Sequence, residues 1–251
     1  MPIHDFNAQR LFVERDLSAG LLIDCPSEQV NYLVNVLRLK PDDTILVFNG
    51  RDGEWASRVV EAAKRRCELQ IETQVRPQDA PQILHYYFAP LKKSRLDYMV
   101  QKAVELGASH LHPVLTQRTV AERIKLERVR ANAIEAAEQC GILSLPHISE
   151  PLKFKALIET WSNGFPLIFC DELAAVANPL EALAAVPPGP VGVLIGPEGG
   201  FSPEEREVLL KAPFCHPISL GPRIMRADTA AVAALSIVNA VLGDWRAARE
   251  P

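Results

Sequence analysis

Two glycine-rich segments late in the chain constrain its fold and chemistry more than any other feature. They are Leu194-Ile-Gly-Pro-Glu-Gly-Gly-Phe-Ser202 and Leu220-Gly-Pro-Arg-Ile-Met-Arg-Ala-Asp-Thr-Ala230. Each follows a short apolar run and leads into a sequence of helical character. Glycine allows close approach of the backbone, and helix starts offer free N–H groups, so such loops commonly hold ligands through main-chain groups. Two of them in one stretch of chain predict a single pocket built from both.

The first segment is framed by clear structural signals. The apolar run 191–195 predicts a buried strand that enters the loop. Ser202 is predicted as the N-cap of the next helix, with Pro203 at its first position and Glu205 closing a capping box. The segment lacks the motifs of phosphate-binding loops and of dinucleotide-binding folds. Taken alone, it is most simply interpreted as a connection that holds no ligand.

The second segment adds charge. Arg223 and Arg226 flank two apolar residues, and Asp228 and Thr229 are predicted to cap the alanine-rich run 230–242. That run favours helix and is nearly apolar throughout, so we expect it to be buried. An arginine just before a buried helix is either a capping or ion-pair residue or part of a site, and the residues alone leave both interpretations open for Arg226.

Both segments resemble the signature loops of the RsmE family, the bacterial 16S rRNA (uracil-1498-N3)-methyltransferases of the SPOUT superfamily. The resemblance covers nearly the whole chain. It extends to Tyr32-Leu-Val-Asn-Val-Leu-Arg-Leu-Lys-Pro-Asp-Asp43, Lys102-Ala-Val-Glu-Leu-Gly107 and Ile134-Glu-Ala-Ala-Glu-Gln139. The chain departs from the family pattern at Asp228, where Glu is common, and at Gly141-Ile142, where the family continues to an arginine.

The resemblance implies S-adenosylmethionine as cofactor, held by backbone groups of both loops and completed by the loop at Asp171-Glu172. The cofactor-binding residues that it implies are Leu194, Ile195, Gly196, Pro197, Glu198, Gly199, Gly200, Leu220, Gly221, Ile224, Met225, Thr229 and Ala230. Arg226 is expected to orient or polarise the uracil, and Arg10 matches an N-terminal arginine of the family that is expected to reach RNA across a homodimer. These two are the expected catalytic residues.

The expected reaction moves a methyl group from a sulfonium to a ring nitrogen, so the site must align the two, remove the N3 proton and stabilise negative charge on uracil. The base is expected to leave its stack. Glu138, Gln139 and Asp228 are candidates to take the proton, but each is equally suited to cap a helix. Two alternatives stay open: a non-catalytic RNA-binding or ribosome-assembly module, and a related methyltransferase that acts on tRNA or a ribose 2′-OH.

The net charge of −4 requires that any contacts to RNA phosphates be local. The expected partner is 16S rRNA, within the 30S subunit. The expected RNA-binding residues are Arg38, Lys92, Lys93, Arg95 and Lys102. A second basic stretch, 118–130, is mixed with Glu122 and Glu127 and is better interpreted as a solvated helix face.

Other features exclude several classes of protein. No apolar run approaches the roughly 20 residues that span a bilayer, and the start of the chain lacks a signal-sequence pattern. The five cysteines are scattered without a Cys-x-x-Cys motif, which favours reduced thiols in the cytoplasm over disulfides or a zinc site. We expect no metal, and we interpret His85, His110, His112, His147 and His216 as packing or surface residues.

The pattern of elements divides the chain. Residues 1–75 predict a small β-barrel-like domain, with strands near 20–24, 44–48, 54–60 and 67–72 and a helix over 26–36. The resemblance implies that this domain is PUA-like and binds rRNA. Residues 77–81 predict a linker.

Residues 82–251 predict an α/β domain. Strands are expected at 83–89, 110–115, 166–170, 191–195 and 217–220, and helices at 94–106, 124–140, 179–185, 203–210 and 229–242. This alternation predicts a parallel sheet covered by helices on both faces. Sequence rules favour an unknotted sheet, whereas the resemblance implies a SPOUT domain with a C-terminal trefoil knot.

Overall fold

The structure, a computed structural model, describes residues 8–120, 123–161, 164–175 and 178–246. The start of the chain, judged above for a signal sequence, lies outside these residues, as does Glu122. The chain forms two compact units, Met1–Ala80 with Ala137–Leu145, and Pro81–Ala136 with Pro146–Pro251. No helix in the described ranges is both long and apolar enough to cross a membrane.

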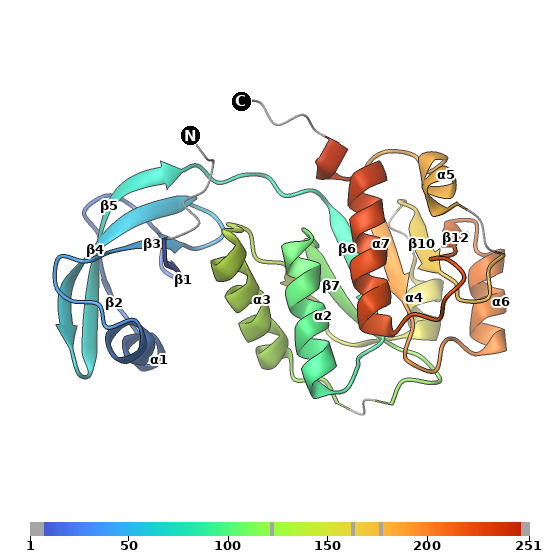
Figure 1. Cartoon of the computed structure of the whole chain (residues 1–251), viewed down its shortest axis with the longest axis horizontal. Helices are drawn as coiled ribbons and strands as arrows, with labels where there is room; N and C mark the ends of the chain where they lie inside the picture. The colour runs from blue at the N-terminus through green and yellow to red at the C-terminus, as the bar shows by residue number, and fades with distance from the viewer. Residues whose placement is uncertain (1–7, 121–122, 162–163, 176–177, 247–251) are drawn as a thin grey trace. The chain divides into compact units, whose positions relative to one another are not determined.

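The N-terminal unit is built on a five-stranded sheet of order β1-β3-β4-β5-β2 (Figure 1). The strands are β1 (Arg10–Phe12), β2 (Leu22–Asp24), β3 (Thr44–Phe48), β4 (Glu54–Ala63) and β5 (Arg66–Arg76). Strands β2 to β5 confirm the four expected strands. Strand β1 was not expected, and it pairs with β3 in parallel while the remaining pairings are antiparallel.

The helix expected at 26–36 is present, but its form differs from a regular α-helix. It begins as α1 (Ser27–Val30) and continues as the π-helix η1 (Asn31–Val36). Val30 and Leu33 face the core of this unit, together with Val47 of β3 and Leu69 and Ile71 of β5. The helical segment therefore closes one side of the curved sheet with its apolar residues.

The C-terminal unit contains the expected parallel sheet. Its main strands run in the order β12-β10-β11-β6-β7-β8, and β9 pairs with β7. All of these pairings are parallel. The strands are β6 (Leu84–Phe88), β7 (His110–Leu115), β8 (His147–Ile148), β9 (Leu152–Lys153), β10 (Leu167–Cys170), β11 (Val191–Ile195) and β12 (Cys215–Ile218).

Helices cover both faces of this sheet. They are α2 (Lys93–Glu105), α3 (Leu126–Cys140), α4 (Phe154–Glu159), α5 (Pro179–Ala184), α6 (Pro203–Lys211) and α7 (Ala227–Val241), followed by the short 3-10 helix η2 (Asp244–Arg246). Helices α2 and α7 lie side by side (Figure 1). Tyr87 faces the opposite layer, where it joins a core with Phe154 and Leu157 of α4 and Leu209 of α6. Helix α4 was not expected.

The topology places three loops at one edge of the sheet. Strand β10 lies between β11 and β12 and runs parallel to both, so the carboxyl ends of all three point the same way. The loops that follow them begin at Asp171, Gly196 and Ser219. Ligands of open parallel sheets bind outside the carboxyl ends of strands, so the fold itself directs attention to these loops.

Candidate functional site

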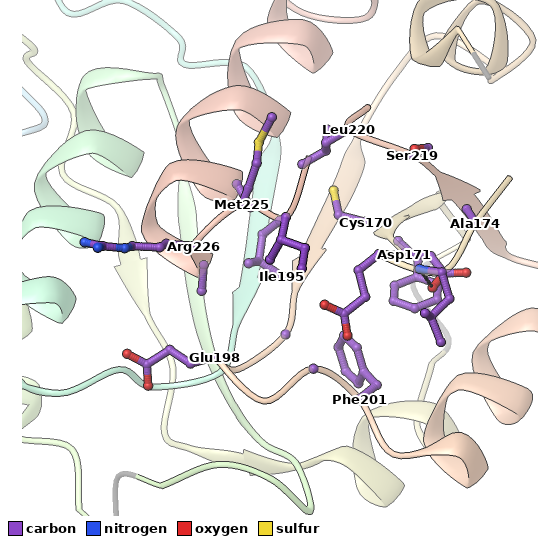
Figure 2. Close-up of a pocket in the computed structure, with 18 of the residues that line it drawn as sticks. Cys170, Asp171, Ala174, Ile195, Glu198, Phe201, Ser219, Leu220, Met225 and Arg226 are labelled. Carbon is purple, nitrogen blue, oxygen red and sulfur yellow. Dashed lines mark hydrogen bonds between the residues drawn. The ribbon is translucent and has the colours of Figure 1, made fainter. Parts of the chain in front are cut away.

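A cavity of about 380 Å³ opens where these three loops meet (Figure 2). This volume lies within the range of roughly 300–1,000 Å³ for small-molecule sites. Among the residues expected to bind a cofactor, those that line the cavity are Ile195, Gly196, Pro197, Glu198, Gly200, Leu220, Gly221, Ile224, Met225 and Ala230. Leu194, Gly199 and Thr229 are not among its lining residues: Leu194 is buried in β11, and Gly199 and Thr229 are exposed.

The start of α6 fixes the end of the first loop. The predicted capping box is confirmed: Ser202 Oγ accepts from the Glu205 N–H at 3.2 Å, and Glu205 Oε2 accepts from the Ser202 N–H at 3.0 Å. The other oxygen of Glu205 accepts from the Gln117 N–H at 2.8 Å. A buried carboxylate that accepts from two separate backbone segments therefore holds this loop against the segment that follows β7.

The glycines of the two loops differ in what they require. Gly200 has φ of +68°, and a side chain there would collide with Glu172 Oε1. Gly221 has φ of +105° and open space where a Cβ would stand. Gly199 has neither constraint, because its nearest neighbour would be Arg118 Cβ at 3.6 Å. Backbone conformation thus demands glycine at positions 200 and 221, and not at 199.

The loop after β10 brings two carboxylates to the cavity. Asp171 is 4% exposed and is paired with Arg206 of α6, whose Nη2 lies 2.8 Å from Asp171 Oδ2. The hydrogen bonds that Arg206 donates to Asp171 raise the pKa of the Arg206 guanidinium above its usual value. Glu172, the next residue, is exposed within the same cavity. Cys170 also lines it, and burial raises the pKa of this thiol to about 12, so the thiol is neutral.

Two arginines from outside the glycine-rich loops contact the first of these loops. Arg95, near the start of α2, places Nη1 2.7 Å from Glu198 Oε1. Arg118, after β7, donates from Nη1 to the carbonyl oxygen of Gly199 at 2.8 Å. Arg95 was expected to bind RNA, and it is engaged with the first loop instead of projecting freely. Neither contact could be predicted from local sequence patterns, because each joins residues about 80 to 100 positions apart.

The second loop presents its charged residues to the cavity. Arg226 takes the N-cap position of α7, makes no capping bond with its side chain, and is one of the residues that line the cavity. Its guanidinium points away from Cys170 and Asp171 (Figure 2). Arg223 also lines the cavity and is exposed. The helix begins at Ala227, ahead of the Asp228 and Thr229 predicted to cap it. Asp228 accepts from the Thr229 N–H within the first turn.

The other expected RNA-binding residues lie outside the cavity. Lys92 and Lys93 are exposed where α2 begins. Lys102, farther along α2, lies 2.7 Å from Glu105 and over the ring of Tyr98. Arg38 is exposed in the N-terminal unit and has a φ of 58°.

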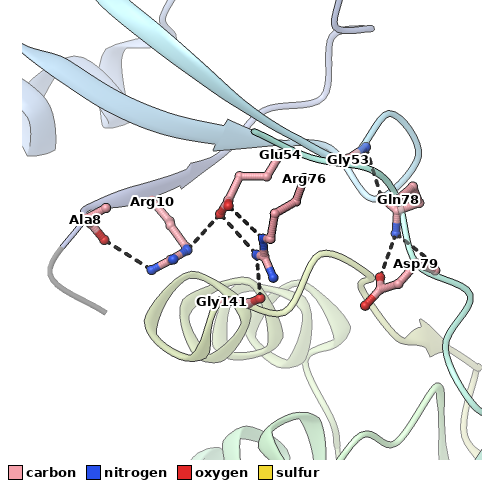
Figure 3. Close-up of polar contacts among 8 residues, drawn as sticks. All are labelled: Ala8, Arg10, Gly53, Glu54, Arg76, Gln78, Asp79 and Gly141. Atoms are coloured by element: carbon pink, nitrogen blue, oxygen red, sulfur yellow. Dashed lines mark hydrogen bonds and ion pairs between the residues drawn. The ribbon is translucent and has the colours of Figure 1, made fainter. Parts of the chain in front are cut away.

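Arg10 does not line the cavity. It is 5% exposed within the N-terminal unit, where its guanidinium pairs with Glu54 and donates to the carbonyl oxygen of Ala8 (Figure 3). The proposed proton acceptors also lie elsewhere. Glu138 accepts from the Phe12 N–H, and Gln139 is exposed at the end of α3. Asp228 is likewise absent from the cavity lining.

Four histidines form a cluster on the sheet of the C-terminal unit. His85 stacks on His110 and Phe165, and its Nδ1 lies 2.9 Å from His112 Nε2. His147 lies beside His110. These ring contacts agree with the expected interpretation of the four histidines as packing or surface residues. Within the described residues, no group of three or more His, Cys, Asp or Glu side chains could hold a metal ion.

Comparison with known proteins gives consistent matches over most of the chain. The RNA methyltransferase domain matches residues 78–239, and the RNA methyltransferase PUA domain matches residues 26–72. Among curated proteins, ribosomal RNA small subunit methyltransferase E of Synechocystis is 31% identical, covering 94% of this chain and 78% of the relative. The protein of that name from Rickettsia conorii is 28% identical, covering 92% and 94%.

Solved structures agree. Ribosomal RNA small subunit methyltransferase E from Neisseria gonorrhoeae, solved with bound S-adenosylmethionine, superposes with a TM-score of 0.81. The two sequences are 26% identical, and the match covers 95% of this chain and all of the other. The α/β fold and the PUA-like N-terminal domain expected from the sequence are thus confirmed.

Proposed function

This chain belongs to the RNA methyltransferase family that includes ribosomal RNA small subunit methyltransferase E, and on that premise we propose that it methylates N3 of a specific uridine (1498) in 16S rRNA, with S-adenosylmethionine as methyl donor. The observation that carries the proposal is the single cavity that both glycine-rich loops line at the carboxyl edge of the sheet. Loops that only join a strand to a helix would not be expected to line a shared cavity.

The lining of the cavity fits the parts of the methyl donor. Phe169, Ile195 and Leu220 offer apolar surface for a purine ring. Gly200 and Gly221 keep the backbone free of side chains where it approaches the cavity. Glu172 provides a carboxylate for polar groups of the donor. We therefore assign the cofactor to this cavity, with the lining residues of both loops as its binding residues.

The residues of the chain have separate tasks in the reaction. When bound, S-adenosylmethionine would supply a methyl group on a sulfonium: the bond from sulfur to the methyl carbon breaks as the bond to uracil N3 forms, S-adenosylhomocysteine leaves, and the N3 proton passes to water. Arg226 lines the cavity and carries a planar set of N–H donors. We assign it to the uracil oxygen that gains negative charge as the proton leaves, where a fixed cation lowers the barrier.

We assign RNA binding to the N-terminal unit and to the start of α2. The N-terminal unit matches a PUA domain of RNA methyltransferases. Lys92 and Lys93 are exposed where α2 begins, and α2 also supplies Arg95 to the cavity. Basic residues here would guide the phosphates of the target strand toward the site.

Assembly and location complete the proposal. We propose a cytoplasmic homodimer with a trefoil knot in its C-terminal unit, acting on 16S rRNA within the 30S subunit. Arg10 is assigned to RNA contacts across that dimer. Within its own unit, its ion pair with Glu54 also stabilises the fold. Light scattering at micromolar concentration tests the assembly, and an active monomer would contradict it.

The decisive experiment is to incubate the protein with labelled S-adenosylmethionine and 30S subunits that lack the modification, and then to map the labelled nucleoside. We expect a single 3-methyluridine in 16S rRNA. Label in tRNA or at a ribose 2′-OH would instead support a related methyltransferase. Binding of rRNA without any transfer of label would support a non-catalytic RNA-binding module.

A further inference from the structure

The carboxylates that line the cavity are not equivalent. Asp171 is neutralised by Arg206, whose Nε lies 3.0 Å from both of its oxygens. Glu198 is paired with Arg95 at 2.7 Å. For Glu172, in contrast, the described part of the chain provides no hydrogen bond or ion pair, although it is exposed in the same cavity. One carboxylate of this site is therefore available to a ligand.

The position of Glu172 narrows what that ligand group is. Strands β10 and β11 are parallel neighbours, with Phe169 opposite Leu194. The glycine-rich loop follows β11, and Glu172 follows β10. Dinucleotide-binding folds use the same relation: a glycine-rich turn after one strand holds the ligand backbone, and an acidic residue farther along binds ribose hydroxyls. The fold differs here, but the geometric requirement is the same.

The contact between Glu172 and Gly200 supports this comparison. Glu172 Oε1 lies so close to Gly200 that any side chain at position 200 would displace this carboxylate. The carboxylate therefore reaches from the end of β10 to the loop after β11, and both residues line the cavity. Glycine at position 200 leaves room for this carboxylate and suits the φ of +68°.

We propose that Glu172 binds the vicinal ribose hydroxyls of the adenosine moiety, one hydroxyl to each carboxylate oxygen. This inference rests on the proposed function, because it assumes that S-adenosylmethionine occupies the cavity. An ionised carboxylate accepts hydrogen bonds only, and its two oxygens match two adjacent O–H donors. Glu172 is then a specificity residue that selects a ribonucleoside cofactor.

The test measures binding by calorimetry, without turnover. The ligands are S-adenosylhomocysteine and its 2′-deoxy and 3′-deoxy analogues, each titrated into the full-length protein and into Glu172→Gln. In the unmodified protein, loss of one hydroxyl should weaken binding roughly 10- to 100-fold, as expected for a hydrogen bond to a charged group. Glu172→Gln should bind the complete ligand more weakly by a similar factor and should discriminate poorly among the three ligands.

Matched variants keep the outcome clear. Glu207→Gln removes a carboxylate from the exposed face of α6, where it pairs with Lys211, and should retain full discrimination. Glu172→Asp keeps the charge but shortens the side chain. Its discrimination against the deoxy analogues should therefore lie between that of the unmodified protein and that of Glu172→Gln. Thermal unfolding of each variant, with midpoints unchanged, shows that lost binding is local.

Each result decides one question. If the unmodified protein fails to bind S-adenosylhomocysteine, the proposed function itself is wrong. If it binds, and Glu172→Gln still discriminates against the deoxy analogues as strongly, the ribose assignment is overturned. S-adenosylmethionine is titrated into the same two proteins. If Glu172→Gln weakens its binding much more than that of S-adenosylhomocysteine, the carboxylate serves the sulfonium, and the ribose assignment is overturned as well.

Discussion

Arg10 Nε lies 2.8 Å from Glu54 Oε1, and the two side chains are only 4% and 3% exposed. Arg76 completes the group, with Nε 2.8 Å from the other oxygen of Glu54 and Nη2 donating to the Gly141 carbonyl (Figure 3). One carboxylate thus compensates two guanidinium groups beside the end of α3, where backbone carbonyls carry partial negative charge. This arrangement makes Glu54 the central residue of the group.

Glu54→Gln should destabilise the N-terminal unit strongly, because it removes the buried carboxylate that pairs with the buried Arg10 and the half-buried Arg76. The expected loss is about 3 kcal/mol or more in the free energy of unfolding, measured by urea denaturation. The matched control is Glu61→Gln on the same strand, whose pair with Arg66 is largely exposed and should therefore contribute little to stability. Equal losses in the two variants would contradict a central role for Glu54.

The pair at Gly199 and Gly200 allows a second test. Gly200→Ala should weaken binding of S-adenosylmethionine at least tenfold, because alanine must adopt a φ of +68° and displace Glu172. Gly199→Ala should bind almost normally, since its new methyl group would meet only Arg118 at ordinary contact distance. Calorimetry and thermal unfolding of both variants check this, and a stronger effect at Gly199 would refute it.

Local patterns predicted most of this fold. Apolar runs bounded by glycine and proline located all the long strands, and the capping box at Ser202 located the start of α6. Strand β1 was not predicted, because its three residues are too few to show an alternating pattern and its partner β3 is more than 30 positions away. Helix α4 was not predicted because it lacks a start signal: Lys153 precedes it and makes no capping bond. Helix α5 has the same length, but Asn178 caps it and Pro179 begins it.

The backbone of the candidate site could be predicted from the sequence, whereas the partners of its charged side chains could not. Glycines, caps and strand ends are local, so both loops could be located from the chain alone. The partners of its side chains are set by tertiary folding. Arg95 was expected to face RNA, yet it pairs with Glu198 about 100 positions away. Arg10 was expected to reach RNA across a homodimer, and the sequence alone did not show that its guanidinium pairs with Glu54 within its own unit.

The basic residues of α2 should contribute unequally to RNA binding. Replacing both Lys92 and Lys93 by Ala should reduce the slope of log Kd against log salt by about 1.4 to 1.8, as expected for two lost phosphate contacts. Lys102→Ala should change it little, because Lys102 already pairs with Glu105. Filter binding of an rRNA fragment across a salt series measures both. An unchanged slope in the double variant would mean that these lysines only face solvent.

The histidine cluster should make stability depend on pH. Burial, with neighbouring histidines, lowers the pKa of His85 from 6.5 to about 4 and that of His112 from 6.5 to about 3. The unfolded chain therefore takes up these protons first. Stability from this source is complete above pH 6.5 and is lost as the pH falls toward 4 and then 3.

Urea midpoints between pH 8 and pH 4 measure this loss. His85→Phe keeps the stacking surface beside Phe165 and removes one titrating group, so its midpoint should fall less steeply below pH 6.5. His216→Asn, on β12 and outside the cluster, should follow the unmodified protein. If His85→Phe shows the same slope as His216→Asn, the cluster does not govern the acid sensitivity.

Arg226 offers the sharpest test of the catalytic assignment. Arg226→Ala should leave the Kd for S-adenosylmethionine within about threefold, because the loop backbone and apolar walls bind the cofactor, and should lower the single-turnover rate on 30S subunits about 100-fold. Arg226→Lys keeps the charge without the planar fork of donors, so it should recover part of that rate. Arg246→Ala, in η2 outside the cavity, is the control. An unfolded Arg226→Ala protein would show that this arginine supports the start of α7, and normal turnover would remove it from the reaction.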